Sequence, residues 1–321
     1  MTPTDIFRRT ALGRGLADIR QVAIADGPGA GGRLIEVRTP SGLCADIALD
    51  RGGDLLRLSY KGAEIGWHSN TRAPCAWPDS EAEHGLGFLR GFDGFMVTCG
   101  LDHHGVPAET SADAFLYPLR DTNVHPLHGR IAAQKAEVLE KQIDWDAGVI
   151  SVKLRIQQAS VFGEHLELLR TYRFSLSVAE IKITDRVTNR GFRPVRHGIL
   201  YHFNAGFPFL NPQSRLTGKY WALSDKLDES GAEPSGDHIE VVLADIAPHD
   251  GRVGLTNGAG QVLMIQFDPD ALPITALWKA FQSGTFALGL EPQTNLDDRV
   301  RSHLAAGEQR DYHLNVSICD Q

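Results

Sequence analysis

The sequence predicts an all-β fold, specifically a large antiparallel β-sandwich. In the second half of the chain, apolar and polar residues alternate over many short segments, as half-buried strands require. Turn residues separate these segments, and the sequence shows neither a pair of long helices nor the strand–helix alternation of a parallel sheet. Roughly ten or more short strands with turns between them indicate two antiparallel sheets packed face to face.

The expected elements follow one another with few helices. Residues 4–12 are expected to form a short helical turn capped by Thr4. Residues 33–39 and 43–49 form a predicted hairpin, because Pro40-Ser41-Gly42 supplies a turn between them. Further predicted strands cover residues 150–157, 166–176, 180–187, 240–243, 261–267, 274–281, 286–290 and 312–318.

Two long stretches lack any sustained period. Residues 66–94 are crowded with glycine, proline and aromatic residues, and residues 99–130 form a second such region with one helical turn expected near Ala112. Irregular segments of this length inside a compact domain are usually functional.

Composition limits the class of protein. A chain of 321 residues can bury a large core, and without a linker or composition break we expect one domain over 1–321, with 1–30 as a peripheral N-terminal segment. Lys and Arg total 32 against 40 Asp and Glu, so the net charge of −8 argues against nucleic acid as a partner.

The location is expected to be cytoplasmic. No basic amphipathic helix or apolar span favours a membrane partner, and the N-terminus lacks the apolar region of a secretory signal. The four cysteines, widely scattered and without C-x-x-C spacing, are expected to be buried thiols in a reducing compartment: Cys44, Cys75, Cys99 and Cys319.

Glu291 is the best candidate for a general base. Residues 286–290 alternate in size as a half-buried strand does, and Pro292 is expected to end the strand because it has no N–H to donate. Glu291 would then stand at a strand end, held by the sheet behind it and open to a ligand in front. A solvated strand-end glutamate is the alternative.

Among the 13 histidines, three contexts stand out. His128 precedes a glycine in PLHGR, His202 lies among aromatic residues in LYHFN, and His103 and His104 are adjacent in a loop. Neighbouring histidines point to opposite sides of an extended chain, and H-x-H, H-E-x-x-H and paired cysteines are absent, so no metal is expected. A histidine and a glutamate are suited to acid–base catalysis near neutral pH. Without a phosphate loop or dinucleotide fingerprint, we expect no cofactor.

Four motifs, taken together and in this order, carry a resemblance: TCGLDH at 98–103, PLHGRI at 126–131, YHFN at 201–204 and GLEPQ at 289–293. The combination resembles the galactose mutarotase (aldose 1-epimerase) superfamily, and most of all its uncharacterised aldose-1-epimerase-like branch. The similarity extends over most of the chain, from about Asp50 onward.

The resemblance implies a β-supersandwich that holds a sugar on one concave face. In that family the glutamate of GLEPQ takes the proton of the anomeric hydroxyl and a strand-end histidine protonates the ring oxygen. The sugar ring opens, C1 turns, and closure gives the other anomer. By resemblance Glu291 is the base and His202 the acid, while His128 bonds the sugar or shares the acid role. One more residue usually separates the family's histidine from Phe-Asn, so His197 is the alternative acid.

The remaining predicted sugar-binding residues rest on side-chain chemistry. Arg51 and Arg90 are flanked by glycines and could donate several hydrogen bonds to hydroxyls or to an acidic sugar; a surface ion pair is the alternative for each. The other candidates are Asp102, His103 and Lys279, with Asp268 as a second choice for the family's sugar-binding aspartate. Trp67 and Trp278 could stack on a sugar or belong to the core.

The favoured function is therefore a cofactor-free isomerase that interconverts the anomers of a free aldose. Two alternatives stay open: a non-catalytic carbohydrate-binding protein, and a sugar isomerase or epimerase that acts at C2. The expected partner is a small sugar, neutral or acidic, and a homodimer is left open.

Overall fold

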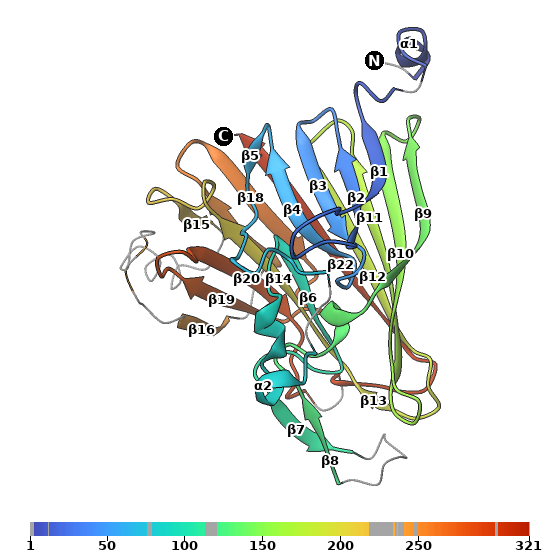
Figure 1. The fold of residues 1–321 in the computed structure, drawn as a ribbon, viewed down its shortest axis with the longest axis vertical. Helices are drawn as coiled ribbons and strands as arrows, with labels where there is room; N and C mark the ends of the chain where they lie inside the picture. Colours follow the sequence, from blue (N-terminus) through green and yellow to red (C-terminus); the bar gives the residue numbers. More distant parts are fainter. Residues whose placement is uncertain are drawn as a thin grey trace.

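The computed structural model describes residues 3–11, 13–75, 79–112, 121–217, 234, 236, 250–298 and 301–320, together with the backbone of 241–246. Helical structure in these residues is confined to short pieces, namely α1 (Pro3–Phe7), α2 (Ala82–Gly85) and the 3₁₀ turns η1 (Gly87–Arg90) and η2 (Ile131–Ala133). Nearly everything else that is regular is strand, as the sequence predicts (Figure 1).

The first large sheet has ten antiparallel strands and carries the N-terminal hairpin predicted from the sequence. Its order is β1 (Asp18–Ala23), β2 (Arg33–Arg38), β3 (Leu43–Ala48), β4 (Asp54–Tyr60), β6 (Met96–Leu101), β14 (Gly198–Gly206), β20 (Ala287–Gln293), β19 (Ile274–Ala280) and β16 (Val241–Ile246), with β5 (Ala63–Glu64) beside β4.

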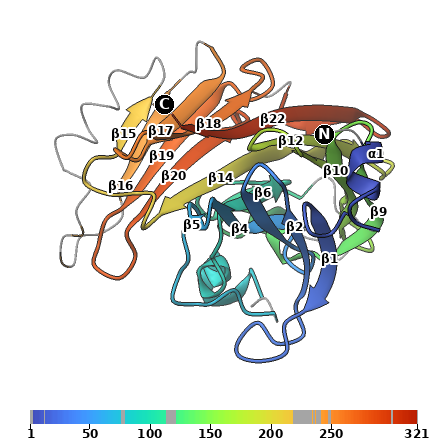
Figure 2. The ribbon, with the colours of Figure 1, turned by 90° about the horizontal axis from the view of Figure 1, so that it is seen from above.

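The second large sheet has eight strands and is also antiparallel. Its order is β15 (Arg215–Thr217), β17 (Arg252–Thr256), β18 (Gln261–Phe267), β22 (Gln309–Asp320), β12 (Glu180–Asn189), β11 (His165–Ser175), β10 (Val149–Ala159) and β9 (Ala136–Asp144). The two sheets face each other and form the sandwich (Figure 2).

Two small ladders lie outside these sheets. One pairs β7 (Ala108–Ser111) with β8 (Thr122–His125), and the other pairs β13 (Val195–Arg196) with β21 (His303–Leu304). The hairpin β7–β8 and α2 lie together at the lower end of the molecule in Figure 1. The irregular region 99–130 thus contains strands, and Ala112 is not helical; residues 113–120, the rest of the expected turn, lie outside the described residues.

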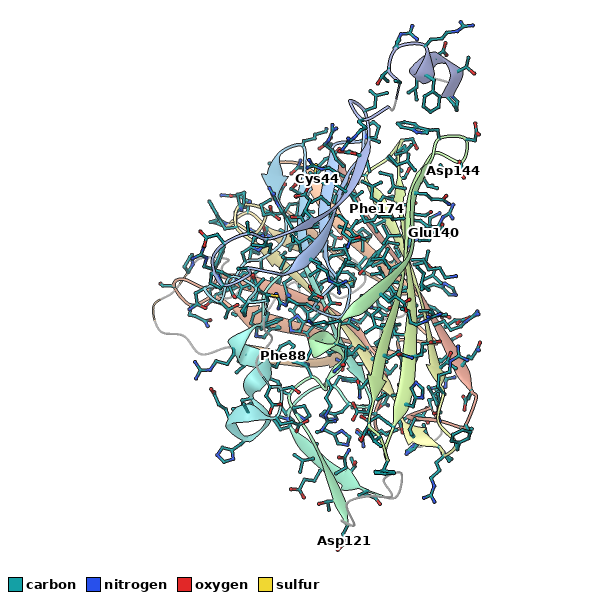
Figure 3. The ribbon with its side chains drawn as sticks, turned by 45° about the vertical axis from the view of Figure 1, so that its right-hand side comes forward. Cys44, Phe88, Asp121, Glu140, Asp144 and Phe174 are labelled. Carbon is teal, nitrogen blue, oxygen red and sulfur yellow. The ribbon has the colours of Figure 1, made fainter. Side chains whose placement is uncertain are left out.

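One main core fills the space between the large sheets. It combines residues such as Leu58 and Phe203 of the first sheet with Phe174 and Val316 of the second, all at most 1% exposed (Figure 3). Alternate residues of each strand point into this core. The other face of the first sheet carries a separate cluster of mainly apolar residues, and this second face positions the candidate site.

A buried ion network joins the sheets beneath that site. Arg170 of β11 is fully buried and donates to Asp185 of β12 at 2.6 Å and to Asp54 of β4 at 3.0 Å. The hydroxyl of Tyr201 in β14 donates to Asp185 at 2.8 Å. Removal of one member of such a buried network leaves an unpaired charge, so the network favours one arrangement of the two sheets.

The expectation that Pro292 ends its strand is wrong. β20 continues to Gln293, and Pro292 pairs with Thr275 of β19. On the other side of β20, the register runs from Leu200↔Gln293 to Phe203↔Leu290, and no pair is formed at the two positions between them. The missing N–H of Pro292 therefore falls where the ladder with β14 is already interrupted, so the strand tolerates it.

In the part of the chain that the structure describes, no helix is both long and apolar enough to cross a membrane.

Candidate functional site

His202 and Glu291 lie opposite each other on neighbouring strands. The register of β14 and β20 places them at facing positions in the interrupted part of the ladder, and His202 Nε2 is 3.1 Å from Glu291 Oε1. Both side chains project from the second face of the first sheet, and the two residues are only 3% and 5% exposed. The sequence predicted these two residues as acid and base, and the fold brings them into direct contact.

A glycine makes room for this contact. Gly289 lies two residues before Glu291 on the same face of β20. A Cβ at this position would come within 2.8 Å of Glu291 Oε1 and 2.9 Å of His202 Cε1, closer than real Cβ contacts allow. The absence of a side chain at residue 289 therefore permits the carboxylate and the imidazole to meet.

Aromatic rings surround the pair. The ring centroids of Phe92 and Trp278 lie 4.9 and 5.3 Å from that of His202, and Trp67 contacts both of these aromatic side chains. Phe88 packs against Phe92 at 4.9 Å. Such faces can stack on the C–H surfaces of a sugar ring, and they lower the local dielectric around the pair.

One buried donor points to a ligand on this face. Trp278 is 6% exposed, yet its Nε1–H has no hydrogen-bond partner within the described residues. Buried indole N–H groups usually have an acceptor, because an unpaired donor costs free energy. Trp67, by contrast, donates to the carbonyl of Thr285 at 2.7 Å.

His128 approaches from a loop. Its ring lies 5.6 Å from the ring of His202 at an angle of 83°, and 4.9 Å from Phe88. Its backbone has a positive φ of 60°, and Gly129 follows with φ 72°. A Cβ on Gly129 would lie 2.3 Å from the carbonyl oxygens of Gly100 and His103, so only glycine fits there. The glycine after His128 thus permits a close approach of backbone to backbone.

Burial lowers the pKa of both histidines of this site. It lowers the pKa of His202 well below the ordinary value, and His128 adds to the effect while a hydrogen bond with Asn204 opposes it. Burial, with a smaller contribution from His103, lowers the pKa of His128 to about 4. Glu291 Oε1 lies 3.1 Å from His202 Nε2, and a carboxylate at that distance stabilises the protonated imidazole.

His197, the alternative acid, has structural partners instead. It is fully buried, its Nδ1 lies 2.9 Å from the carbonyl oxygen of Leu101, and its Nε2 lies 2.7 Å from the hydroxyl of Tyr312. With Nδ1–H donating to Leu101, Nε2 accepts from Tyr312, so both ring nitrogens are occupied.

Three predicted sugar-binding residues have other contacts or another orientation. Arg51 is 5% exposed, donates to the carbonyl oxygen of Gly91, and so holds the segment that carries Phe92. Burial lowers the pKa of Arg51 to about 10, against the effect of Asp93. The side chain of Arg90 is 66% exposed and pairs with Glu83. Lys279 pairs with Leu288 in the register, so it projects from the opposite face to Trp278 and Glu291.

Asp102 and His103 belong to a different cluster. Asp102 accepts from His125 at 2.8 Å, from Arg130 at 2.9 Å and from Gln158 at 2.6 Å. His103 bonds the carbonyl of Val106 at 2.7 Å and packs on His125. Asp268, the second choice for a sugar-binding aspartate, bonds the backbone of Asp270 in an exposed turn.

Sequence reasoning did not single out Phe88, Phe92 or Gly289. The phenylalanines lie in the irregular stretch 66–94, whose length and aromatic content were the only available signals. The role of Gly289 depends on a strand that lies far away in the sequence, so no local pattern could reveal it.

Comparisons with known proteins bear on the fold. Similar solved structures include a protein from Klebsiella pneumoniae assigned as an aldose 1-epimerase (24% identity, 94% of this chain and 83% of that chain, TM-score 0.81). A galactose mutarotase-like protein from Clostridium acetobutylicum has 16% identity over 96% of this chain and 100% of that chain, with a TM-score of 0.65.

A galactose 1-epimerase from Lactobacillus acidophilus has 11% identity over 95% of this chain and 99% of that chain, with a TM-score of 0.58. At these identities the likeness shows the fold. Among curated proteins, none matches the chain.

The likeness confirms the resemblance seen in the four motifs, because the described strands form the galactose mutarotase-like sandwich. A family model described as "Domain of unknown function (DUF4432)" matches residues 29–318. The chain thus belongs to the DUF4432 family and has the galactose mutarotase-like fold.

Proposed function

We propose that this protein interconverts the anomers of a free aldose by general acid–base catalysis, with Glu291 as base and His202 as acid. The observation that carries the proposal is the 3.1 Å contact between these two side chains on an aromatic face. The anomeric hydroxyl oxygen and the ring oxygen of a hemiacetal are both bonded to C1. A base and an acid this close together can therefore exchange protons with both oxygens. The named activities of the similar structures support the same class of reaction.

The steps balance within the site. Glu291 accepts the proton of the anomeric hydroxyl, the C1–ring oxygen bond breaks, and the ring oxygen keeps the electron pair of that bond and takes a proton from the imidazolium form of His202. Rotation about C1–C2 exposes the other face of the aldehyde. Closure then returns one proton to His202 and takes the other from Glu291, so both residues regain their starting states.

Two neighbouring groups are placed to hold the sugar. Trp278 offers a buried N–H donor and a flat face, and His128 reaches the same space from its loop. Arg51 contributes by holding the Phe92 segment. Because His202 and Glu291 are almost fully buried, binding of a sugar to them requires neighbouring side chains to move.

The central test uses NMR with a panel of neutral and acidic aldoses. It measures the rate of anomer exchange and, by saturation transfer, the binding of each sugar. Glu291→Gln should slow exchange by roughly 10²–10⁴-fold, because the variant has no base, while sugar binding survives. Glu137→Gln is a matched control, because Glu137 is an exposed residue of β9 that pairs with Arg155. Exchange at the wild-type rate in Glu291→Gln would refute the proposal.

The same experiment separates the alternatives. Binding without exchange in the wild-type protein would favour a non-catalytic carbohydrate-binding protein. Reaction in deuterated water distinguishes chemistry at C2, because an enediol intermediate would introduce deuterium at that carbon, whereas ring opening and closure leave the C–H bonds intact. A cytoplasmic location and a homodimer stay predictions.

A further inference from the structure

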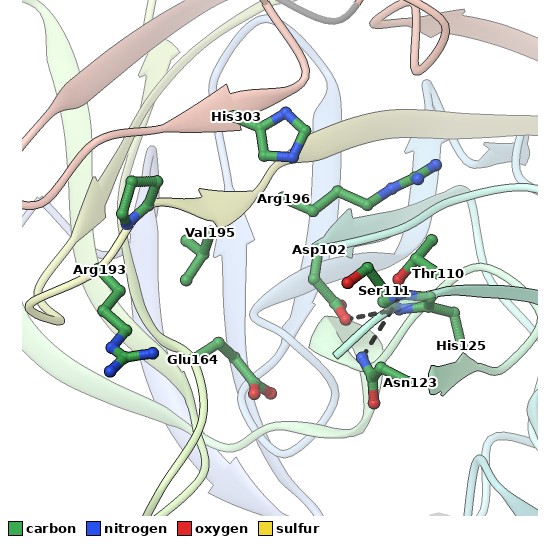
Figure 4. A pocket seen from close by; sticks show the side chains of 11 residues that line it. Asp102, Thr110, Ser111, Asn123, His125, Glu164, Arg193, Val195, Arg196 and His303 are labelled. Carbon is green, nitrogen blue, oxygen red and sulfur yellow. Dashed lines mark hydrogen bonds and ion pairs between the residues drawn. The ribbon is translucent and has the colours of Figure 1, made fainter. Parts of the chain in front are cut away.

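A cavity lies apart from the His202–Glu291 pair, and neither of these two residues lines it. It measures about 430 Å³, within the range of roughly 300–1,000 Å³ that is usual for small-molecule sites. Figure 4 shows its labelled side chains around a common space: Arg196 and His303 on one side, Glu164 across from them, and the cluster of His125 beside them. None of these residues takes part in the chemistry proposed above.

The side of the cavity formed by the β7–β8 hairpin is a rigid hydrogen-bonding surface. Asp102 holds Nδ1 of His125 at 2.8 Å, and Nε2 of the same ring lies 2.7 Å from the hydroxyl of Thr110. Asn123 contacts the same Nε2 at 3.4 Å. The carboxylate fixes the proton on Nδ1, so Nε2 is the acceptor and the Thr110 hydroxyl donates to it. Hydroxyl and amide groups held in this way suit a hydroxylated ligand.

The opposite side carries a guanidinium and an imidazole. Arg196 of β13 and His303 of β21 are direct partners in their antiparallel ladder, so both side chains leave the same face. Both line the cavity. Nε of Arg196 is buried and has no hydrogen-bond partner in the described ranges. An anion between these two side chains would give that donor an acceptor.

The acidic groups of the cavity have partners of their own. Asp102 is bound by Arg130 and Gln158 as well as by His125. Glu164 is 6% exposed, and burial together with the Asp102 carboxylate raises its pKa, while Arg130 and a hydrogen bond with Gln158 oppose that shift.

We propose that this cavity is a binding site for a small hydroxylated carboxylate of monosaccharide size, separate from the His202–Glu291 pair. Arg196 and His303 bind the carboxylate of the ligand, because a guanidinium presents paired N–H donors to two oxygens. Thr110 and Asn123 bind its hydroxyl groups.

The test is isothermal titration calorimetry of the full-length protein with gluconate. Acetate, inorganic phosphate and sorbitol are the comparison probes, since each lacks either the hydroxyl groups, the carboxylate or the charge. Gluconate should bind at least about tenfold more tightly than each of them. Equal binding of sorbitol would overturn the anionic part of the proposal, and equal binding of acetate or phosphate would overturn the role of the hydroxyl groups.

Variants locate the binding site. Arg196→Gln and, separately, His303→Gln should each weaken gluconate binding by about tenfold or more. Arg190→Gln is the matched control, because Arg190 lines the neighbouring cavity and pairs with Glu167 at 2.6 Å. Thermal melts check that each variant is folded. Because His303 is exposed, His303→Gln should fold even if Arg196→Gln does not, and it then supplies the test.

The Glu291→Gln variant separates this proposal from the proposed activity. It should lose anomer exchange and keep gluconate binding. Binding that is lost in Glu291→Gln and kept in Arg196→Gln would place gluconate at the His202–Glu291 pair and overturn the second site, whatever the outcome for anomer exchange.

Discussion

The contact between His202 and Glu291 depends on residue 289 being a glycine. Gly289→Ala would place a methyl group within 3 Å of both the carboxylate oxygen and the imidazole carbon. We expect anomer exchange to fall by about tenfold or more, since small displacements of catalytic groups are costly. Gly15→Ala is the control, because no atom lies within 4 Å of a Cβ there. Unchanged exchange in Gly289→Ala would show that the contact is not needed.

The two candidate acids can be told apart by what each substitution costs. His197→Asn should lower the free energy of unfolding by about 1–3 kcal/mol, because Tyr312 and Leu101 lose their buried partner. Its exchange rate should stay near that of the wild type. His202→Asn should show the reverse: a large loss of exchange with a smaller loss of stability. Urea unfolding and NMR exchange on both variants measure the contrast, and loss of exchange in His197→Asn alone would make His197 the acid.

The segment η1 and the loop that follows it form one wall of the site. Arg51 holds this wall through the carbonyl oxygen of Gly91, next to Phe92. Arg51→Met keeps much of the side-chain volume but removes the donor, so Phe92 should lose its fixed position over His202. We expect KM for the sugar to rise by about tenfold with a smaller change in kcat, since the acid and base stay in place. Arg90→Met, in the same segment but exposed, should leave both constants unchanged. Equal kinetics for the two variants would contradict the role of Arg51.

The molecule as a whole should lose stability as the pH falls below neutral. Burial lowers the pKa of His104 to about 3 and that of His197 to about 4, whereas an unfolded histidine has a pKa of about 6.5. Between pH 6.5 and 4 the unfolded chain therefore binds more protons than the folded chain. The free energy of unfolding must then decrease as pH falls through this range, by about 1.4 kcal/mol for each pKa unit of difference at each residue.

Urea unfolding at a series of pH values between 7.5 and 4.5 measures this dependence. His197→Asn removes one of the buried histidines with a lowered pKa, so its stability should fall less steeply with acid. An equally steep fall in the variant would mean that other groups govern the acid sensitivity.

Much of the fold follows from local chemistry. The period of two in residues such as 150–157 and 312–318 identified strands that the structure confirms, because a strand with one buried face must alternate along its own length. His128, His202 and Glu291 were also found from short motifs, and the fold places them together. Each of these signals is contained in a few consecutive residues.

Other features depend on which strands become neighbours. Pro292 is tolerated inside β20 because the ladder to β14 is interrupted beside it, and Lys279 points away from Glu291 although it adjoins Trp278. Asp102 and His103 were expected at the sugar, yet their loop turns toward His125 and a separate cavity.

The amino-acid order was thus enough to name the strands, the family resemblance and the residues that we propose as acid and base, since these depend on side-chain type and on motifs along single segments. Pairing and register between distant strands selected the face that each side chain occupies. They arise from burial of the sandwich core, a property of the folded chain that no single segment contains.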